Sequence, residues 1–385
     1  MDANRRGGVL LAALMCAARV ATAGEAAEEL RFDDAGPGAS DYYSLSLYSE
    51  NDVYVTSTST DRYYTTGQKA TLLSTRLNGF EEWFRQRWTR VLARAATEKA
   101  ERNTQVRQTA RDPGPRMARS EQPTQYRVAM TFGHNIYTPD DIKSAGLVPD
   151  DRPYAAWLYL GVALQARSTL EGQWAKLSVW HVDLGVVGPA ALGKEVQDFV
   201  HDNISGSARA QGWAHQLQNE PGFNFVYQHR IRWSPEASEE GRNFDAIGQA
   251  GFSLGNVATF ANLGFTLRGG FHLPDDFGND IIRPGSETSQ VGGREPKWGA
   301  LVFAGAGGRA VARDIFLDGN TFRASHSVAK EVWVADFNFG VTVNYRGWVL
   351  TVAQVFRTPE FKAQKGPQVY GAATLTVPFG RGRNR

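Results

Sequence analysis

Two neighbouring segments near the start of the chain concentrate oxygen-bearing side chains where two β-strands are expected to meet. Residues 45–49 alternate between polar and apolar, and a second alternating run begins near residue 63. The polar residues between them include Glu50, Asn51, Asp52, Asp61 and Arg62, and Tyr64 and Thr65 lie at the start of the second run. Carboxylate, amide and hydroxyl oxygens suit a hard cation or a polarised substrate, and loop edges often carry binding residues. The alternative is an ordinary polar hairpin loop, because Asn and Asp favour turns.

A second candidate group lies in the long loop over residues 183–222, where residues 193–205 are expected to form a short helix. Gln197 and His201 are four residues apart, so they share one face of that helix. Its expected packing stripe, roughly opposite His201, consists of Val196, Phe199, Val200 and Ile204. Histidine titrates near neutral pH and can take a proton from water, so His201 is a candidate general base. The alternative is a structural or solvated histidine.

A third motif resembles a serine nucleophile but lacks the required context. Residues 251–255 read GFSLG, which matches the G-x-S-x-G pattern around Ser253. That motif works at a strand-to-helix elbow of an α/β sheet. Here it runs from an expected strand into a Gly255-Asn256 turn with no helix after it, so Ser253 is not assigned a catalytic role.

The N-terminus has the features of a secretory signal, which predicts cleavage after Ala23. Residues 5–6 are both arginine, residues 9–18 are apolar, and residues 21–23 read ATA. Residues 24–40 then form a leader. Cys16 is the only cysteine and lies within the signal, so we expect neither a disulfide nor a thiolate metal site in the mature chain. No later run of about 18 apolar residues predicts a transmembrane helix.

Strict alternation in the rest of the chain predicts an all-β fold. In residues 334–345, apolar residues alternate with polar or small ones, as in a strand with one apolar and one wet face. With the two strands beside the first loop, about twelve strands are expected, the others at 126–133, 157–167, 174–182, 223–233, 244–254, 257–269, 298–309, 334–345, 348–357 and 368–379. This pattern favours a closed antiparallel transmembrane β-barrel over residues 41–379, with a short helix in a long loop. A soluble β-sandwich also alternates and is the alternative.

Other parts of the chain complete this scheme. Aromatic residues at strand ends are candidates for interfacial girdles: Trp157, Trp174, Trp233, Trp348 and Phe379. Residues 79–125 are a basic insertion that we expect to be mobile. Residues 269–297 are expected to form a long periplasmic turn, and 380–385 a C-terminal tail. The net charge of +2 gives no indication of a partner.

Several motifs together resemble the lipid A 3′-O-deacylase family, a group of outer-membrane β-barrel esterases. The similar pieces are Asn51-Asp52, Asp61-Arg62 with Tyr64-Thr65, FGHNIYTP at 132–139, Asp151-Arg152 with Tyr154, GVVGP at 185–189, Glu195-Val196-Gln197, His201, and Trp213 with Gln216. They lie in the family's order across about the first half of the mature chain. The C-terminal half matches only in pattern. The resemblance implies a monomeric outer-membrane hydrolase that removes an ester-linked acyl chain, expected to be 3′-O-linked, from lipid A in the outer leaflet.

The resemblance also implies roles for particular residues. His201 is the general base, Gln197 and Asn51 orient water or substrate, Asp52 lies beside a metal or orients His201, and Thr65 lies at the metal rim. The implied cofactor is Ca²⁺, which polarises the ester carbonyl. Lys143 is the nearest match to a lysine of the family. The family's acid after the histidine has no clear match here, and Glu195 or Asp202 is the candidate substitute.

Two arginines and two other functions remain open. Arg62 and Arg152 each follow an aspartate at a loop edge, and either tether loops through salt bridges or bind a lipid A phosphate. The other functions are a non-catalytic barrel, as a pore or structural protein, and a phospholipase-type esterase. We expect lipopolysaccharide and membrane as partners, and no nucleic acid.

Overall fold

The computed structural model describes residues 42–51, 63–74, 124–170, 173–205, 208–235, 243–278 and 298–381. The expected signal peptide and leader, nearly all of the 79–125 insertion, and most of the C-terminal tail lie outside these residues. None of the helices in the described ranges is long and apolar enough to cross a membrane.

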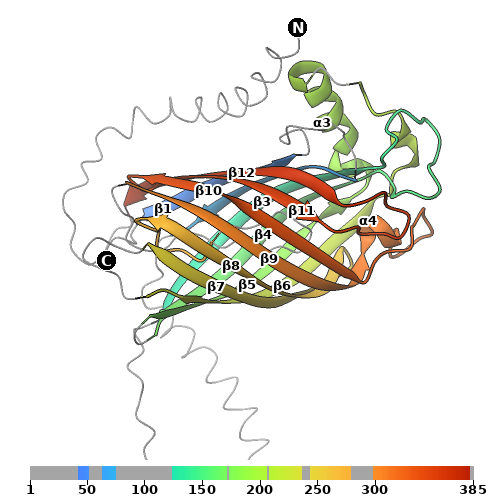
Figure 1. Cartoon of the computed structure of the whole chain (residues 1–385). Coiled ribbons are helices and arrows are strands. Elements are labelled where there is room, and N and C mark those ends of the chain that lie inside the picture. Colours follow the sequence, from blue (N-terminus) through green and yellow to red (C-terminus); the bar gives the residue numbers. More distant parts are fainter. Residues whose placement is uncertain are drawn as a thin grey trace, which may run out of the picture.

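The described chain forms one closed antiparallel β-barrel (Figure 1). Each strand pairs with the next, and β1 pairs with β12. The strands are β1 (Tyr42–Asn51), β2 (Tyr63–Leu73), β3 (Gln125–Thr138), β4 (Ala155–Thr169), β5 (Trp174–Val187), β6 (Glu220–Trp233), β7 (Phe244–Gly255), β8 (Ala258–Phe271), β9 (Trp298–Asp314), β10 (Trp333–Tyr345), β11 (Trp348–Arg357) and β12 (Gln368–Arg381). The predicted count of twelve strands and the closed barrel are confirmed.

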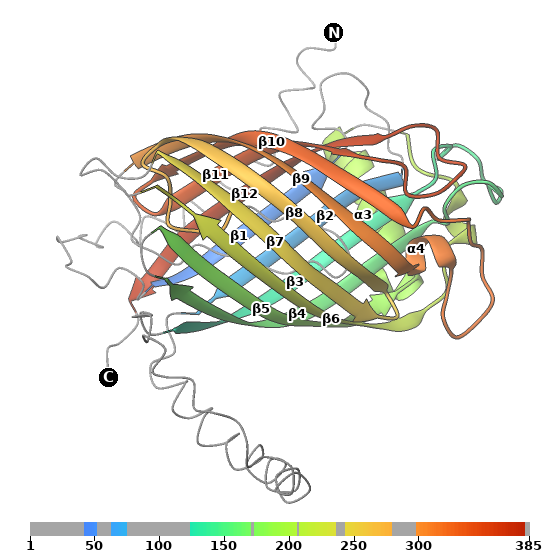
Figure 2. The ribbon, with the colours of Figure 1, turned by 60° about the horizontal axis from the view of Figure 1, so that its bottom comes forward.

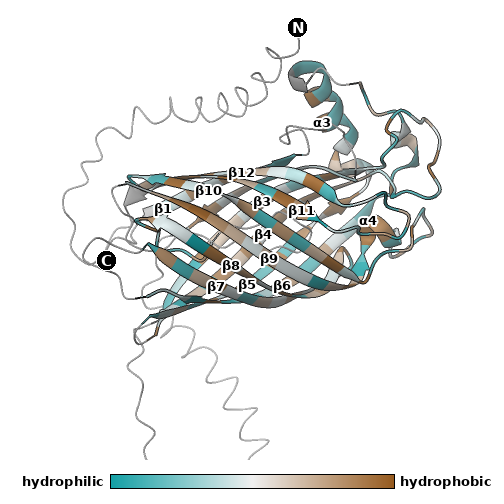
Figure 3. Cartoon of the chain, in the orientation of Figure 1, coloured by the Kyte–Doolittle hydropathy of each residue, from teal (hydrophilic) through white to brown (hydrophobic). Residues whose placement is uncertain are grey.

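The alternation of the sequence decides which side chains face outward. On β10, Phe337, Phe339 and Val341 are about half exposed on the outer face, whereas Asp336 and Thr342 are buried toward the lumen. Brown and teal residues accordingly alternate along the strands in Figure 3. An apolar exterior around a polar interior is the pattern of a barrel that lies in lipid.

Aromatic side chains gather at the end of the barrel where β1 begins and β12 ends, here called the terminus end. They are Tyr43, Trp174, Trp233, Phe244, Phe271, Trp298, Tyr345, Trp348 and Phe379. Four of the five predicted girdle residues belong to this set. Trp157 does not: it faces the lumen, is fully buried and stacks on Tyr159. The prediction for Trp157 was wrong because a tryptophan near a strand end can face either side of the wall.

The segment after β8 turns into the lumen at the terminus end. Asp276 on this segment and Asp245 on β7 both pair with the buried Arg268. Asp275 pairs with Arg232 at 2.6 Å. The segment expected to be a long turn at 269–297 therefore begins as a continuation of β8 followed by a folded plug, and its remainder, 279–297, lies outside the described residues.

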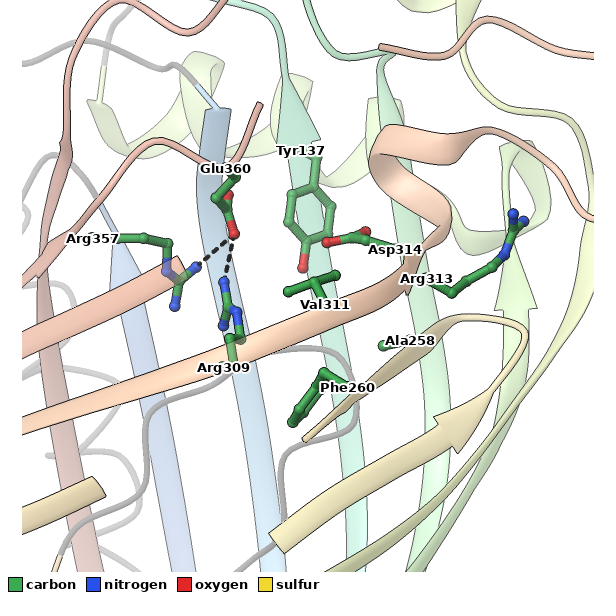
Figure 4. Close-up of a pocket in the computed structure, with 9 residues that line it drawn as sticks. All are labelled: Tyr137, Ala258, Phe260, Arg309, Val311, Arg313, Asp314, Arg357 and Glu360. Carbon is green, nitrogen blue, oxygen red and sulfur yellow. Dashed lines mark hydrogen bonds and ion pairs between the residues drawn. The ribbon is translucent and has the colours of Figure 1, made fainter. Parts of the chain in front are cut away.

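A second buried ion cluster lies toward the opposite end, here called the α3 end (Figure 4). Glu360, in the loop after β11, accepts a hydrogen bond from Arg309 at 2.7 Å (Figure 4). It accepts another from Arg152 at 3.2 Å. Arg357 lies 3.5 Å from the same carboxylate and donates to Asp336 at 2.6 Å. Burial would raise the pKa of Glu360, but the three arginines outweigh it and lower this pKa. The cluster therefore ties two loops to the barrel wall.

Glu360→Ala should destabilise the barrel, because it leaves three buried guanidinium groups with one fewer counter-charge. Removing one partner of a buried ion pair costs about 3–5 kcal/mol, and we expect a loss of this order in the free energy of unfolding, measured by urea titration in vesicles. Lys362→Ala, exposed on the same loop, should stay within about 0.5 kcal/mol of the parent. Equal stability of the Glu360 variant and the parent at neutral pH would contradict the assignment.

The same variant has a predictable pH dependence. A carboxyl group with a lowered folded-state pKa stabilises the fold above its unfolded pKa, and this contribution is lost as pH falls through the folded pKa. The stability difference between the parent and Glu360→Ala should therefore be full at neutral pH. This difference should decrease only when the pH falls below the ordinary pKa range of glutamate.

Candidate active site

The loop between β5 and β6 packs on the outside of the barrel at the α3 end, and α3 stands out from the barrel there (Figures 1 and 2). It contains η3 (Pro189–Ala191), α3 (Gly193–Val200), a π-helical turn η4 (His201–Ser205) and η5 (Gly212–His215). Two outward-facing residues beneath it, Ile136 and Ala156, are fully buried. Phe132 and Leu160, which face outward further along the same strands, are 52% and 65% exposed. The loop therefore covers a patch of the external wall.

Local chain geometry directs this loop onto the wall. β5 ends at Val187, and Gly188 has φ 101°, a left-handed conformation that favours glycine. Pro189 then begins η3, where its fixed φ and missing N–H suit the first helical position. His134, which faces outward on β3, donates from Nε2 to the carbonyl of Ala191 at 2.8 Å and joins η3 to the barrel.

The face of α3 that packs on the barrel is not the predicted one. The buried residues are Gly193, Gln197 and His201, spaced by four, whereas Phe199 is 61% exposed. A Cβ on Gly193 would lie 2.5 Å from Cβ of Ala156. The predicted stripe was wrong because the glycine allows a close approach to the wall, and the polar side chains on the same face find partners there.

Gln197 is held by Trp213 from η5. The indole Nε1 of Trp213 donates to Oε1 of Gln197 at 2.9 Å. Because an indole N–H can only donate, this bond fixes the orientation of the amide and leaves its NH₂ group facing elsewhere. That buried Nε2 atom has no hydrogen-bond partner among the described residues. The amide can therefore donate to a ligand.

His201 is buried, with 3% of its surface exposed. Its Nδ1 lies 2.8 Å from the carbonyl oxygen of Ala208. A carbonyl oxygen can only accept, so Nδ1 carries the hydrogen and the neutral ring has its lone pair on Nε2. This is the tautomer that a general base requires at Nε2.

The external wall beside this loop presents a row of polar side chains. Register places Asn51 opposite Thr66, and Thr66 opposite Ile136 beneath the loop. One step down, Ser49, Gln68 and His134 form a parallel row, and Gln68 donates to Ser49 at 2.8 Å. Asn51, Thr66, Gln68 and His134 therefore share the external face on which α3 packs. The helix itself contacts β3 and β4, the strands next to this row.

The other predicted residues occupy different places. Asp52 and Arg62 lie outside the described residues, and Lys143 is exposed in the loop between β3 and β4. Thr65 is the extra residue of a bulge in β2 and bonds Thr138 through its hydroxyl at 2.7 Å. Arg152 is buried inside the barrel against Glu360, and its contacts match the loop-tethering alternative.

Neither acid proposed as a substitute shares the buried face of α3. Glu195 is exposed and lies nearly opposite Gln197 on the helix. Asp202 is paired with Arg209, and their side-chain hydrogen bonds lower the pKa of Asp202. His134, Gln68 and Trp213 belong to the site in the structure, although sequence reasoning gave them no role. The sequence did contain a signal for two of these residues, because His134 and Trp213 lie within the motifs that carry the family resemblance.

The fit of a metal ion depends on a residue outside the described ranges. Within those ranges, no group of three or more His, Asp or Glu side chains could hold a metal. The outer row offers only neutral oxygens, and Glu50, the neighbouring acid on β1, is buried on the lumen side. Calcium takes 6–8 oxygen ligands, usually with carboxylates. The described residues alone therefore do not fit Ca²⁺, and Asp52, which the family resemblance places at the metal, lies outside them.

Sequence comparison identifies the family. The family described as outer membrane protein LpxR matches residues 9–379. The chain belongs to the LpxR family. It is therefore an outer-membrane protein, as the sequence predicted. A comparison with curated proteins gives no match.

One solved structure agrees with this family at the level of the fold. LpxR from Salmonella typhimurium aligns with a TM-score of 0.62 and 18% identity, covering 87% of this chain and 100% of that one. The β domain of the Bordetella autotransporter BrkA aligns with a TM-score of 0.42 and 8% identity, over 89% of this chain and 100% of that one. The first alignment supports the LpxR-like barrel, and the second is too loose to support a shared fold.

Gly193→Val should loosen α3 from the wall, because the added side chain meets Ala156 and Trp213. Overpacking typically costs about 1–3 kcal/mol. Amide hydrogen exchange within 193–200 should therefore become roughly one to two orders of magnitude faster, while exchange in the barrel strands stays unchanged. Lys194→Val, on an exposed side of the same helix, is the control. Unchanged exchange in the Gly193 variant would refute the packing contact.

Proposed function

We propose that this LpxR-family member is a lipid A deacylase that hydrolyses an ester-linked acyl chain, the 3′-O-linked chain by family resemblance. The observation that carries the proposal is the buried pair of Gln197 and His201 on the face of α3 that packs on the external wall. An outer-wall site gives direct access to lipid of the outer leaflet. Nε2 of Gln197 is buried without a hydrogen-bond partner among the described residues, and such an atom calls for an explanation, of which a functional role is one.

In this mechanism His201 removes a proton from water through Nε2. The resulting hydroxide attacks the ester carbonyl, the bond between the acyl carbon and the sugar oxygen breaks, and a proton returned to that oxygen completes hydrolysis. The bond from Nδ1 to Ala208 holds the ring in the required tautomer. No serine nucleophile is needed: Ser253 faces the lumen on β7 and donates to Ala258.

Gln197 is proposed to bind the carbonyl oxygen or the attacking water through its unpartnered NH₂ group. A donor that is already oriented stabilises negative charge without reorganising during the reaction. Trp213 supplies that orientation. Asn51, on the outer row, is proposed to orient water or substrate from the other side of the site, and Lys143 to bind substrate.

We further propose that Ca²⁺ supports the reaction, held by Asn51, Asp52 and Thr65. Asp52 would supply the negative charge that the described oxygens lack. A bound Ca²⁺ would polarise the ester carbonyl and stabilise charge on its oxygen. Asp52 is the only negatively charged residue among the three proposed ligands. Asp52→Asn should therefore weaken Ca²⁺ binding more than any neutral substitution in the row.

The lumen argues against the pore alternative. Buried ion pairs fill it toward both ends: around Glu360 at the α3 end and around Arg268 at the terminus end. Such clusters occupy the path that ions would take through an open channel. A phospholipase-type esterase would use the same site and is distinguished by its products.

His201→Gln should abolish deacylation while the barrel still folds. General-base catalysis contributes about 10²–10⁴-fold, and glutamine fills similar space but cannot take the proton. The measurement is mass spectrometry of lipid A and phospholipids from cells that express each variant, with folding checked by heat-dependent electrophoretic mobility.

Ser253→Ala is the matched control and should keep its activity. The proposal fails if His201→Gln still removes an acyl chain from lipid A, or if the serine variant is the inactive one. Altered phospholipids beside intact lipid A in the parent would point to the phospholipase-type alternative.

Chelation tests the metal separately. Excess EGTA should abolish lipid A hydrolysis by the purified protein, and added Ca²⁺ should restore it. Calorimetric titration should show Ca²⁺ binding that Asp52→Asn weakens, whatever the state of catalysis. Full hydrolysis in excess chelator would exclude Ca²⁺ from the mechanism.

A further inference from the structure

The side of α3 away from the barrel is divided into an apolar edge and a charged edge. Successive helical residues are about 100° apart, which places Val196, Phe199 and Val200 along one edge. Leu192, the N-cap in a left-handed conformation, directly precedes the helix. Leu192 is 50% exposed and Phe199 is 61% exposed. The other edge carries the ion pair of Lys194 with Asp198, and Glu195 lies beside it. A helix with this division suits a boundary between apolar and aqueous surroundings.

The apolar edge is continuous with the lipid-facing surface of the barrel. Val196 packs against the same hydrophobic cluster as Leu158 on β4 and Val186 on β5. The next outward residues on these strands, Leu160 and Leu184, are exposed. The apolar surface therefore extends from the bare wall onto α3 without an intervening polar belt.

The height of α3 on the barrel agrees with this arrangement. Trp174 lies in the aromatic set at the terminus end, and Val186 lies twelve residues further along β5. At about 3.3 Å per residue and a strand tilt of about 40°, this separation is roughly 30 Å along the barrel axis. The apolar band of such barrels is about 25 Å tall. The base of the helix thus lies about 5 Å beyond the far boundary of the band, in the interfacial region.

We propose that α3 lies in the membrane interface at the α3 end of the barrel, with Leu192 and Phe199 in contact with the acyl chains of the surrounding lipid and the charged edge turned toward water. Lipid is the occupant because it already covers the exposed wall directly beside the helix. The inference rests on the outer-membrane location and the packing of α3, and it holds whether or not the protein is a hydrolase.

Spin labels at single cysteines test the depth of each edge. Cys16→Ser removes the only native cysteine, and Leu192→Cys, Phe199→Cys and Lys194→Cys are then made separately in the full chain. Each labelled protein is folded into vesicles of dioleoylphosphatidylcholine. Electron paramagnetic resonance measures collisions of the label with oxygen, which concentrates in lipid, and with a water-soluble nickel complex.

Labels at 192 and 199 should collide more with oxygen than with nickel, and the label at 194 should show the reverse. Dominant nickel collisions at 199 would mean that this edge faces water, which overturns the proposal. Low collision rates with both reagents at 192 and 199 would mean that protein covers the edge, as a second copy or another loop, and would overturn it equally.

Discussion

Closure of β1 on β12 is the constraint on which the other features depend. Backbone polar groups inside a bilayer cannot bond water, so each strand must find its partners on both sides, and a barrel without edges meets this requirement. Once the ring is closed, the pleat assigns every strand residue to the lumen or to lipid. A polar side chain that faces outward near the bilayer must then be covered or used. Gln68 and His134 are two such residues, and α3 lies beside them.

The inner and outer faces of the barrel wall carry different kinds of interaction. Inside, arginines and carboxylates pair across the lumen, and Glu360 with Arg152 ties loops at the α3 end to the strands. Outside, His134 on the wall bonds the carbonyl of Ala191 in the loop after β5, and within that loop His201 bonds the carbonyl of Ala208. The cluster around Glu360 therefore lies on β9, β10 and β11 and on two loops, whereas the candidate site lies on the outer face of β1 to β4.

Much of the barrel could be predicted because alternation is a local property of the sequence. Residues 334–345 indicate a strand with one wet face without any knowledge of their neighbours, and similar runs led to the correct strand count. The candidate pair of Gln197 and His201 was also recognisable from spacing and resemblance. Features set by packing could not be predicted in this way. Trp157 faces the lumen, and Arg152 bonds a carboxylate 208 positions away in sequence. Nothing local to either residue specifies these outcomes.

The prediction of which face of α3 is buried was wrong, because hydrophobic patterning favoured burial of Phe199. Half a turn of the helix would bury Phe199 and expose His201, yet the structure does the opposite. Gly193 permits contact with Ala156 only in the observed rotation, and Trp213 then bonds Gln197. Burying an amide and an imidazole while exposing a phenyl ring is unfavourable for a helix in water. It becomes favourable where the outer side of the helix meets lipid, so the burial of the candidate catalytic pair and the exposure of the apolar edge have one common cause.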